Sequence, residues 1–314
     1  MKMPLALLTL SLAASLALPA DAGRRQKAYD AQAFQTEADL EASASQFWKA
    51  SGIKKIARED MQRLAIVEFN IEYLTTYVYD SNNQKGGLLG MGLKLGGVGK
   101  RHWELDEQFK QDLPERLYGE LVAMLTERGF EVLPLETLRA SEAFQRLKTE
   151  EEGSTGKKKS SSGGRGYSAK KTQKYEVHSV DGLLDLKDGM FAVMGNTNAQ
   201  AAILHELGAD GAVRVWVRLG LDKKGRPVLM AESHLGIMAG VDVAKMPSGK
   251  EKPFAKHSGS LDAKKALQWS EDARGGKDFK GGKGQVIDID EVEFEKALNE
   301  MYPAFMGMAI ATLR

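Results

Sequence analysis

The chain has 314 residues, of which 42% are hydrophobic, and its 44 basic and 43 acidic residues give a formal net charge of +1. This hydrophobic fraction is that of an ordinary globular protein, and the balanced charge gives no general electrostatic reason to bind nucleic acid. The chain has no cysteine, which excludes disulfide bonds, a catalytic thiolate and cysteine-ligated metals.

Residues 1–22 have the three-part layout of a secretory signal. Lys2 precedes an apolar run from Pro4 to Leu18, and small residues follow up to Ala22. The alternative is a membrane anchor, but this run is shorter than the roughly twenty residues that span a bilayer. We therefore expect export to a bacterial periplasm, cleavage near Ala22, and a mature chain without a transmembrane helix.

Residues 23–62 are predicted to form an N-terminal helical segment, with Phe47 and Trp48 as its apolar anchors. The residues from Arg63 to Tyr79 are rich in β-branched and aromatic side chains and contain neither glycine nor proline. This composition predicts a long or buried strand, which opens the main domain.

A helix is predicted after this strand, because apolar residues recur at helical spacing up to Leu125. Asp112 is its expected cap, Pro114 lies in the expected first turn, and Gly129 is its expected end. The elements expected to follow are a short strand at 130–135 and a short helix at 141–147.

The second half of the chain is expected to supply further strands and the closing helix. Apolar and polar residues alternate from Val213 to Leu219, and a tight turn at Asp222–Gly225 follows. The expected elements are a helix at 199–207, antiparallel strands at 213–219 and 228–238, and a helix at 290–314. Together they predict an α/β fold with a mixed parallel/antiparallel sheet of four or five strands covered by helices.

Three stretches are predicted to interrupt this α/β domain, which spans residues 63–314. They lie at about 80–104, 149–175 and 245–284. The second combines a basic block with few apolar residues, so we interpret it as a flexible, solvated loop, the alternative being a contact with a polyanion. The third is rich in lysine and glycine and is expected to be irregular.

The first interruption contains the glycine-rich stretch GGLLGMGLKLGGVGK, residues 86–100. A phosphate loop would require glycine where Lys94 stands and a hydroxyl side chain where Arg101 stands. The pair Gly90 and Gly92 misses the dinucleotide fingerprint by one residue. We therefore expect no nucleotide and no other cofactor.

Apolar residues alternate with small or polar ones in the same stretch, so an extended strand would be apolar on one face. These apolar residues are Leu89, Met91, Leu93 and Leu95. Such a hairpin could cover its own core, pair with a neighbouring subunit, or contact the outer membrane. Trp216, flanked by Arg214 and Arg218, offers a second candidate interaction surface. The alternative is that this face of the strand is covered by a helix or loop.

No catalytic or metal-binding motif is recognisable. In the sequence HELGAD, Ala209 stands where a zinc peptidase requires a second histidine, so His205 and Glu206 are expected at a helix end. No two of the five histidines lie close in sequence, and a Gly-x-Ser-x-Gly elbow is absent. We therefore expect no catalytic residue and no metal.

The order of these elements resembles a known family. The runs that carry the resemblance are Ala65–Phe69, the glycine-led strand at Gly129–Leu133, and the "LGAD" helix end leading into a strand at Leu207–Val217. They are similar to the periplasmic domain shared by the curli-secretion channel lipoprotein and the amino-terminal domain of TolB. The resemblance covers roughly residues 63–150 and 180–240. It implies a non-enzymatic envelope protein, often oligomeric, although the lipobox cysteine of the curli family is missing here.

These observations predict a periplasmic scaffold associated with secretion or cell-envelope assembly. It would act through protein–protein contacts with envelope proteins or with itself, using a sheet edge, the glycine-rich hairpin and the terminal helices. The alternative is a periplasmic hydrolase or small-ligand-binding protein. Its dispersed site would consist of His102, His205, Glu232 and His234, of which the last two are expected on one face of a strand.

Overall fold

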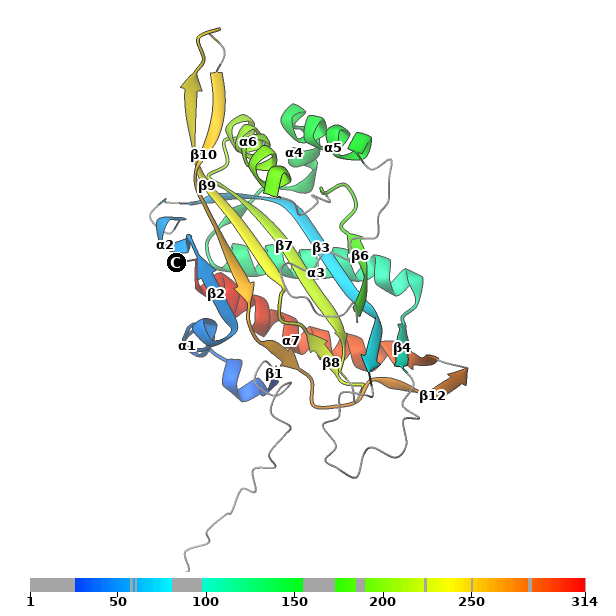
Figure 1. Cartoon of the computed structure of the whole chain (residues 1–314). Coiled ribbons are helices and arrows are strands. Elements are labelled where there is room, and N and C mark those ends of the chain that lie inside the picture. Colours follow the sequence, from blue (N-terminus) through cyan, green and yellow to red (C-terminus); the bar gives the residue numbers. More distant parts are fainter. Residues whose placement is uncertain are drawn as a thin grey trace, which may run out of the picture.

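The computed structural model describes residues 26–56, 59, 61–80, 98–154, 173–184, 190–222, 225–249, 251–281 and 284–313. Within these ranges the chain forms seven α-helices and thirteen strands, and all of these strands belong to one mixed sheet (Figure 1). The predicted mixed α/β class is confirmed. The predicted sheet of four or five strands is wrong, because the sheet is much larger.

The strands are β1 (Gln26–Ala28), β2 (Trp48–Ser51), β3 (Arg63–Asp80), β4 (Val98–Glu104), β5 (Glu131–Val132), β6 (Gln173–Ser179), β7 (Gly211–Leu221), β8 (Pro227–Leu229), β9 (His234–Lys245), β10 (Glu251–Ala263), β11 (Ala266–Gln268), β12 (Arg274–Gly281) and β13 (Gly284–Ile289). The helices are α1 (Glu37–Phe47), α2 (Ile53–Ile56), α3 (Glu107–Glu127), α4 (Leu135–Ala140), α5 (Glu142–Ser154), α6 (Met190–Leu207) and α7 (Glu291–Ala311). A 3-10 turn lies at Ala31–Phe34.

The long strand β3 is the centre of the sheet. It pairs in parallel with β7 and β5, and antiparallel with β4 and β6. Strand β7 continues the sheet through β8 and β9, and β9 continues it through β10 to β2. At the other side β4 pairs in parallel with β13, which pairs with β12. Strand β3 therefore has partners along both edges, and its residues from Leu64 to Leu74 are buried, as the sequence predicts.

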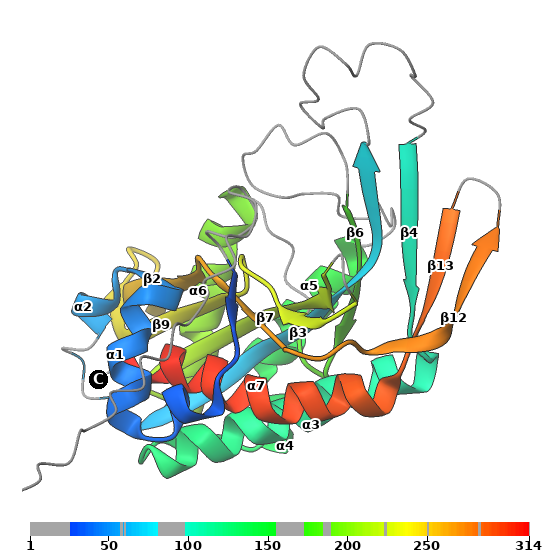
Figure 2. The same cartoon turned by 90° about the horizontal axis from the view of Figure 1, so that it is seen from below.

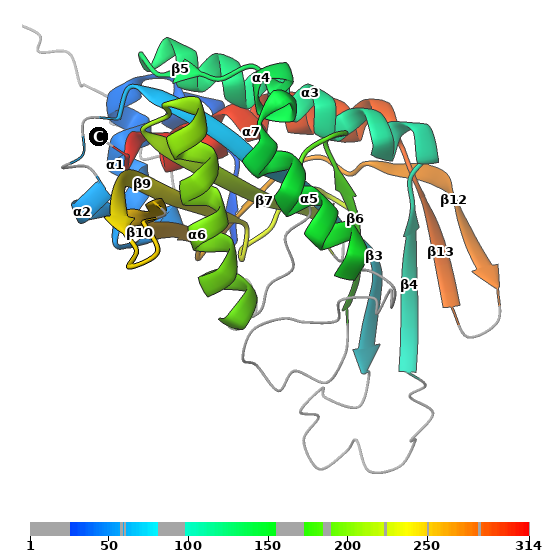
Figure 3. The same cartoon turned by 90° about the horizontal axis from the view of Figure 1, so that it is seen from above.

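Helices cover both faces of the sheet. Helices α3 and α7 lie along one face, and α1 packs against α7 on the same side (Figure 2). Helices α5 and α6 contact each other on the opposite side (Figure 3). The apolar stripe predicted for the last helix is buried, and consists of Phe294, Leu298, Met301, Phe305 and Met308.

Helix α3 begins earlier than the sequence predicts. The side chain of Asp106, rather than Asp112, caps it by accepting hydrogen bonds from the first-turn amides. Pro114 therefore lies inside the helix, where its missing N–H leaves the Lys110 carbonyl without its helical donor. The hydroxyl of Tyr73 donates to this carbonyl at 3.1 Å. A side chain of β3 thus compensates for the proline and fixes the first turns of α3 over the sheet.

Two segments contain strands that the sequence analysis does not predict. Residues 23–62 form helix α1, as expected, but also supply β1 and β2. The prediction that residues 245–284 are irregular is wrong, because they form β10, β11 and β12. Strand β10 pairs with both β9 and β2. Most of the outer half of β10 is exposed, so it has no buried apolar face. Its sequence, with many lysines and glycines, therefore lacks the alternation that predicts a strand.

Several sequence predictions fall outside the described residues. These are the secretory signal at 1–22, the apolar positions Leu89, Met91, Leu93 and Leu95, and most of the interruption at 149–175. Among the helices that are described, none combines the length and the apolar character needed to cross a membrane.

Candidate functional site

The outer halves of β9 and β10 form a two-stranded ribbon that projects from the sheet (Figure 1). We call residues 241–257 the β9–β10 ribbon. Within the described strands, β9 pairs with β7 only up to Ala239, and β10 pairs with β2 only from Ser260 onward. The ribbon therefore has two strand edges whose backbone groups are available to a further strand.

Apolar side chains are exposed on this ribbon. Val243, Met246 and Phe254 have 39%, 44% and 39% of their surface accessible, and outside the ribbon only Val292 joins them among the large apolar residues described as exposed. Charges of both signs lie between them: Lys245 stands opposite Glu251 in the strand pairing. Phe254 stands opposite Asp242 and Val243 stands opposite Pro253, so these two exposed apolar side chains lie on opposite faces of the ribbon, beside charges of both signs.

A second feature is a buried polar row on the face of β3 that points away from α3. Phe69 contacts Tyr118 of α3, so alternation directs Glu68 to the opposite face, where it is fully buried. The Glu68 carboxylate accepts hydrogen bonds from the guanidinium of Arg214 and from Trp216 Nε1 at 2.8 Å. The indole N–H of Trp216 thus donates to a buried carboxylate of the neighbouring strand, which favours a structural role for this residue over a role in binding a partner.

The same row continues along β3 and β7. Glu72 forms an ion pair with Arg218, whose Nη1 also donates to Glu232 at 2.6 Å and whose guanidinium lies 5.0 Å from the Tyr175 ring centroid. Burial disfavours the charged guanidinium, but the Glu72 carboxylate outweighs this and raises the pKa of Arg218. Burial also raises the pKa of Tyr175 to about 12. We call the Glu68–Arg214 and Glu72–Arg218 pairs the β3–β7 charge network; its charges compensate one another.

The structure does not bring together the dispersed residues proposed as an alternative enzyme site. His102 Nδ1 lies 3.0 Å from the Thr76 hydroxyl, beside β3 and β4. His205 lies elsewhere, in a pocket that Asp210 also lines and that does not include His102. The imidazole of His234 contacts a third set of residues.

The prediction that Glu232 and His234 share one face of a strand is wrong. The expected strand at 228–238 is divided into β8 and β9, and Glu232 lies between them with φ of 78°. Its carboxylate binds Arg218, whereas His234 Nδ1 lies 2.8 Å from Asp262 Oδ1. The two side chains therefore have separate partners.

Glu206, from the HELGAD sequence, lies at the end of α6, as predicted. Its carboxylate accepts hydrogen bonds from the backbone amides of Glu142 (2.7 Å) and Ala143 (2.8 Å), in the first turn of α5. Burial alone would raise the pKa of Glu206, but these donors outweigh it and lower the pKa below its usual value. The residue therefore caps a neighbouring helix.

We expect Glu206→Gln to lower the free energy of unfolding by about 1 kcal/mol near neutral pH, as loss of a helix cap does. Because folding lowers the pKa, the stabilisation is fully present above the unfolded value of about 4.3 and is lost as the pH falls through the folded value. Urea unfolding of both proteins from pH 7 downward would measure this. A difference that does not shrink with acidification would contradict the capping role.

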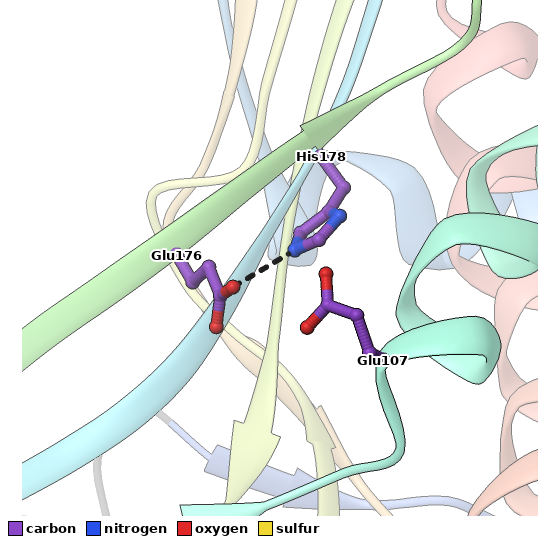
Figure 4. A group of neighbouring side chains, drawn as sticks. All are labelled: Glu107, Glu176 and His178. Carbon is purple, nitrogen blue, oxygen red and sulfur yellow. Dashed lines mark ion pairs between the residues drawn. The ribbon is translucent and has the colours of Figure 1, made fainter.

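A third feature lies where α3 begins and combines side chains from α3 and β6. Figure 4 shows three of them, Glu107, Glu176 and His178, and Lys110 is the fourth. We call Glu107, Lys110, Glu176 and His178 the α3–β6 cluster. Lys110 Nζ lies 2.6 Å from a Glu107 oxygen and 3.0 Å from a Glu176 oxygen. The hydrogen bond from Lys110 lowers the pKa of Glu107; burial would lower the pKa of Lys110, but the two carboxylates raise it.

His178 completes the α3–β6 cluster from the same strand as Glu176. Its ring packs edge-on against Tyr73, with centroids 5.4 Å apart, and only 14% of its side chain is exposed. Its Nε2 lies 3.2 Å from a Glu176 oxygen, but this buried nitrogen has no hydrogen bond of acceptable geometry within the described chain. One ligand atom each from Glu107, Glu176 and His178 lie within 4.8 Å of one another.

A pocket of about 270 Å³ adjoins this cluster and shares Lys110 and Glu176 with it. Its other lining residues are Tyr73, Leu74, Thr75, Thr76, His102, Trp103, Glu104 and Leu105. Trp103 is 5% exposed, and its Nε1 has no acceptor in the described part of the chain. A residue that lines the pocket thus has a buried donor with no acceptor among the described residues.

Sequence reasoning does not find this cluster, although two local signals exist. Glu176 and His178 lie two apart on a strand, which directs both to one face. Glu107 and Lys110 lie three apart on a helix and form a neighbouring pair. What joins these pairs is the packing of α3 against β6, which lies on the far side of the interruption at 149–175.

No family model matches the chain, and comparison with curated proteins and with solved structures finds no match either. The likeness to the curli-secretion and TolB domain therefore stays a prediction from the sequence.

Proposed function

We propose that the protein is a non-enzymatic scaffold of the bacterial cell envelope, associated with secretion or envelope assembly. It acts through protein–protein contacts. The observation that supports this most directly is the β9–β10 ribbon, which combines unpaired strand edges with exposed Val243, Met246 and Phe254.

The physical argument begins with the instability of an isolated ribbon. A two-stranded hairpin without a third strand or a covering layer is marginally stable in water. A partner that adds a strand to one edge satisfies backbone hydrogen-bonding groups, and its side chains can cover part of the exposed apolar surface. Such an arm is therefore suited to binding another protein.

The partner that we propose is a second copy of this chain. The ribbon carries Lys245, Lys252 and Lys256 as well as Asp242 and Glu251, so that two copies can offer each other both charge signs. A two-fold contact uses the same surface on both copies and therefore requires this self-complementarity. The proposed likeness to an often oligomeric envelope domain agrees with this choice.

The charged groups inside the sheet are consistent with a non-catalytic body. In the β3–β7 charge network each carboxylate is paired with a guanidinium. Catalytic groups, by contrast, require at least one member that is left free to exchange a proton or to attack a substrate. The four dispersed residues of the alternative site also have separate surroundings.

Phe254→Glu tests the self-association. We expect the mature chain, without residues 1–22, to be a dimer or larger in light scattering after size exclusion. The variant should associate at least about tenfold more weakly, because it places a charge in an apolar contact. Val292→Glu is the matched control, since Val292 is 75% exposed in the first turn of α7, away from the ribbon.

Two results would refute this arrangement. A wild-type chain that is monomeric over the whole accessible concentration range would exclude a second copy as the partner. Equal association of the Phe254→Glu and Val292→Glu variants would show that the ribbon is not the contact surface.

A further inference from the structure

We propose that the α3–β6 cluster binds one divalent metal ion, with Glu107, Glu176 and His178 as its ligands. The inference does not depend on the proposed scaffold function, because the ribbon belongs to other strands. An experiment can therefore refute the metal site without refuting the scaffold function, and the reverse.

The donor set is the first argument. Two carboxylates and one imidazole supply two oxygens and one nitrogen, a combination that suits Zn²⁺, Mn²⁺ or Fe²⁺. The three donor atoms already lie within 4.8 Å of one another, so closing them around an ion requires only side-chain movement. Glu107 and Glu176 have the freedom to move, because their side chains are 60% and 40% exposed.

The local charge is the second argument. The two carboxylates of the cluster carry two negative charges, and the Lys110 ammonium neutralises one of them. One negative charge remains when His178 is neutral. Glu104 lines the adjoining pocket and adds to this excess. A partly enclosed site with surplus negative charge attracts a cation more strongly than an exposed one.

The unsatisfied donors are the third and independent argument. His178 Nε2 is buried and faces Glu176 without a proper hydrogen bond within the described chain (Figure 4). A neutral imidazole nitrogen in this position is available as a metal ligand. Trp103 Nε1, which is buried beside the same pocket and has no acceptor among the described residues, could donate to a water or anion held by the ion.

Lys110 decides how tightly the ion is held. Its ammonium contacts both carboxylates, so a metal must displace it, and the lysine is then a competing internal cation. Removal of this charge should strengthen binding, which is the opposite of what a purely structural lysine would do. The imidazole ligand should also favour Zn²⁺ over Mg²⁺, since Mg²⁺ prefers oxygen ligands.

Titration calorimetry of the chelator-treated mature chain with Zn²⁺, and in parallel with Mg²⁺, tests the site. We expect one Zn²⁺ per chain and much weaker binding of Mg²⁺. Glu107→Gln and His178→Gln should each weaken Zn²⁺ binding by more than the roughly 10–100-fold that follows loss of a group merely supporting a ligand. Lys110→Met should bind Zn²⁺ at least about tenfold more tightly.

Glu293→Gln is the matched control, because Glu293 also pairs with a lysine three residues later in the first turn of a helix. It should leave Zn²⁺ binding unchanged. Glu107 is exposed, so its glutamine variant keeps the fold, which near-ultraviolet circular dichroism can verify. The proposal is overturned if the wild type binds no Zn²⁺, or if Glu107→Gln and His178→Gln bind it as tightly as Glu293→Gln does. Such persistent binding would point to other exposed pairs, such as His234 with Asp262.

Discussion

Arg214→Met is expected to lower the free energy of unfolding by about 3–5 kcal/mol, because it removes the guanidinium that pairs with the fully buried Glu68 carboxylate. Methionine keeps much of the apolar part of the arginine side chain, so the loss of stability measures the missing charge rather than missing packing. The neutral donors Trp216 Nε1 and Asn70 Nδ2 remain bound to Glu68 but do not replace a positive charge. Urea denaturation with an unchanged slope would measure the loss.

The double variant Glu68→Gln with Arg214→Met should recover part of this stability, because it removes the buried charge as well as its partner. Lys296→Met breaks an exposed ion pair with Glu293 and should have little effect, since exposed pairs contribute little. A loss in Arg214→Met no larger than that in Lys296→Met would show that Glu68 is not held as a buried carboxylate.

Trp48→Ala is the second replacement with a large expected effect, again about 3–5 kcal/mol. The Trp48 side chain is 3% exposed, its ring centroid lies 4.7 Å from that of Phe305, and its Nε1 donates to the Phe305 carbonyl at 3.1 Å. Removing it leaves a cavity between β2 and α7 and deletes the hydrogen bond to the Phe305 carbonyl, which keeps its donor within the helix. Thermal unfolding of the variant would record the loss.

Trp48→Phe is the matched variant, because it keeps an aromatic ring and removes only the hydrogen bond and part of the volume. Its loss should be clearly smaller than that of Trp48→Ala. If the N-terminal segment is part of the same cooperative unit as α7, every variant unfolds in one transition. A separate early transition, with little change in the main one, would contradict this integration.

The elements that could be predicted from the sequence are those whose burial leaves a repeating pattern. Strand β3 is rich in β-branched and aromatic residues because its side chains are buried, and β7 alternates because its two faces differ. Helix α7 shows a stripe with Phe294 and Leu298 in its first half, where one side is buried, and becomes apolar all round at 304–310, where every side is buried. In these cases several successive turns or residues share one environment, so local spacing records it.

The elements that could not be predicted depend on distant partners or on single residues. Strands β1 and β11 have three residues each, too few to show a period, and they exist because they pair with each other. The division between β8 and β9 depends on the positive φ of Glu232, a residue type that gives no such signal. The early start of α3 follows from Tyr73, which compensates for Pro114 from another element.

The α3–β6 cluster shows the same limit for a candidate site. Glu107 and Lys110 resemble an ordinary surface pair of a helix, and Glu176 and His178 resemble an ordinary strand exterior. Only the position of α3 over β6 places these charges next to one another. A search for close histidine spacing misses such a set, because its one histidine is joined by carboxylates from two elements.

The strand pairings also set the order in which a growing chain can become ordered. Strand β1 hydrogen-bonds with β11 and β2 with β10, so residues 26–51 wait for partners that lie more than 200 residues later in the chain. Pairings between such remote segments form slowly. A chain truncated before Glu251 would leave β2 unpaired and the Trp48 ring poorly covered, a surface that chaperones bind and that promotes aggregation. We therefore expect these pairings to form late in folding, and truncations that remove residues 251–313 to be found among insoluble or degraded material.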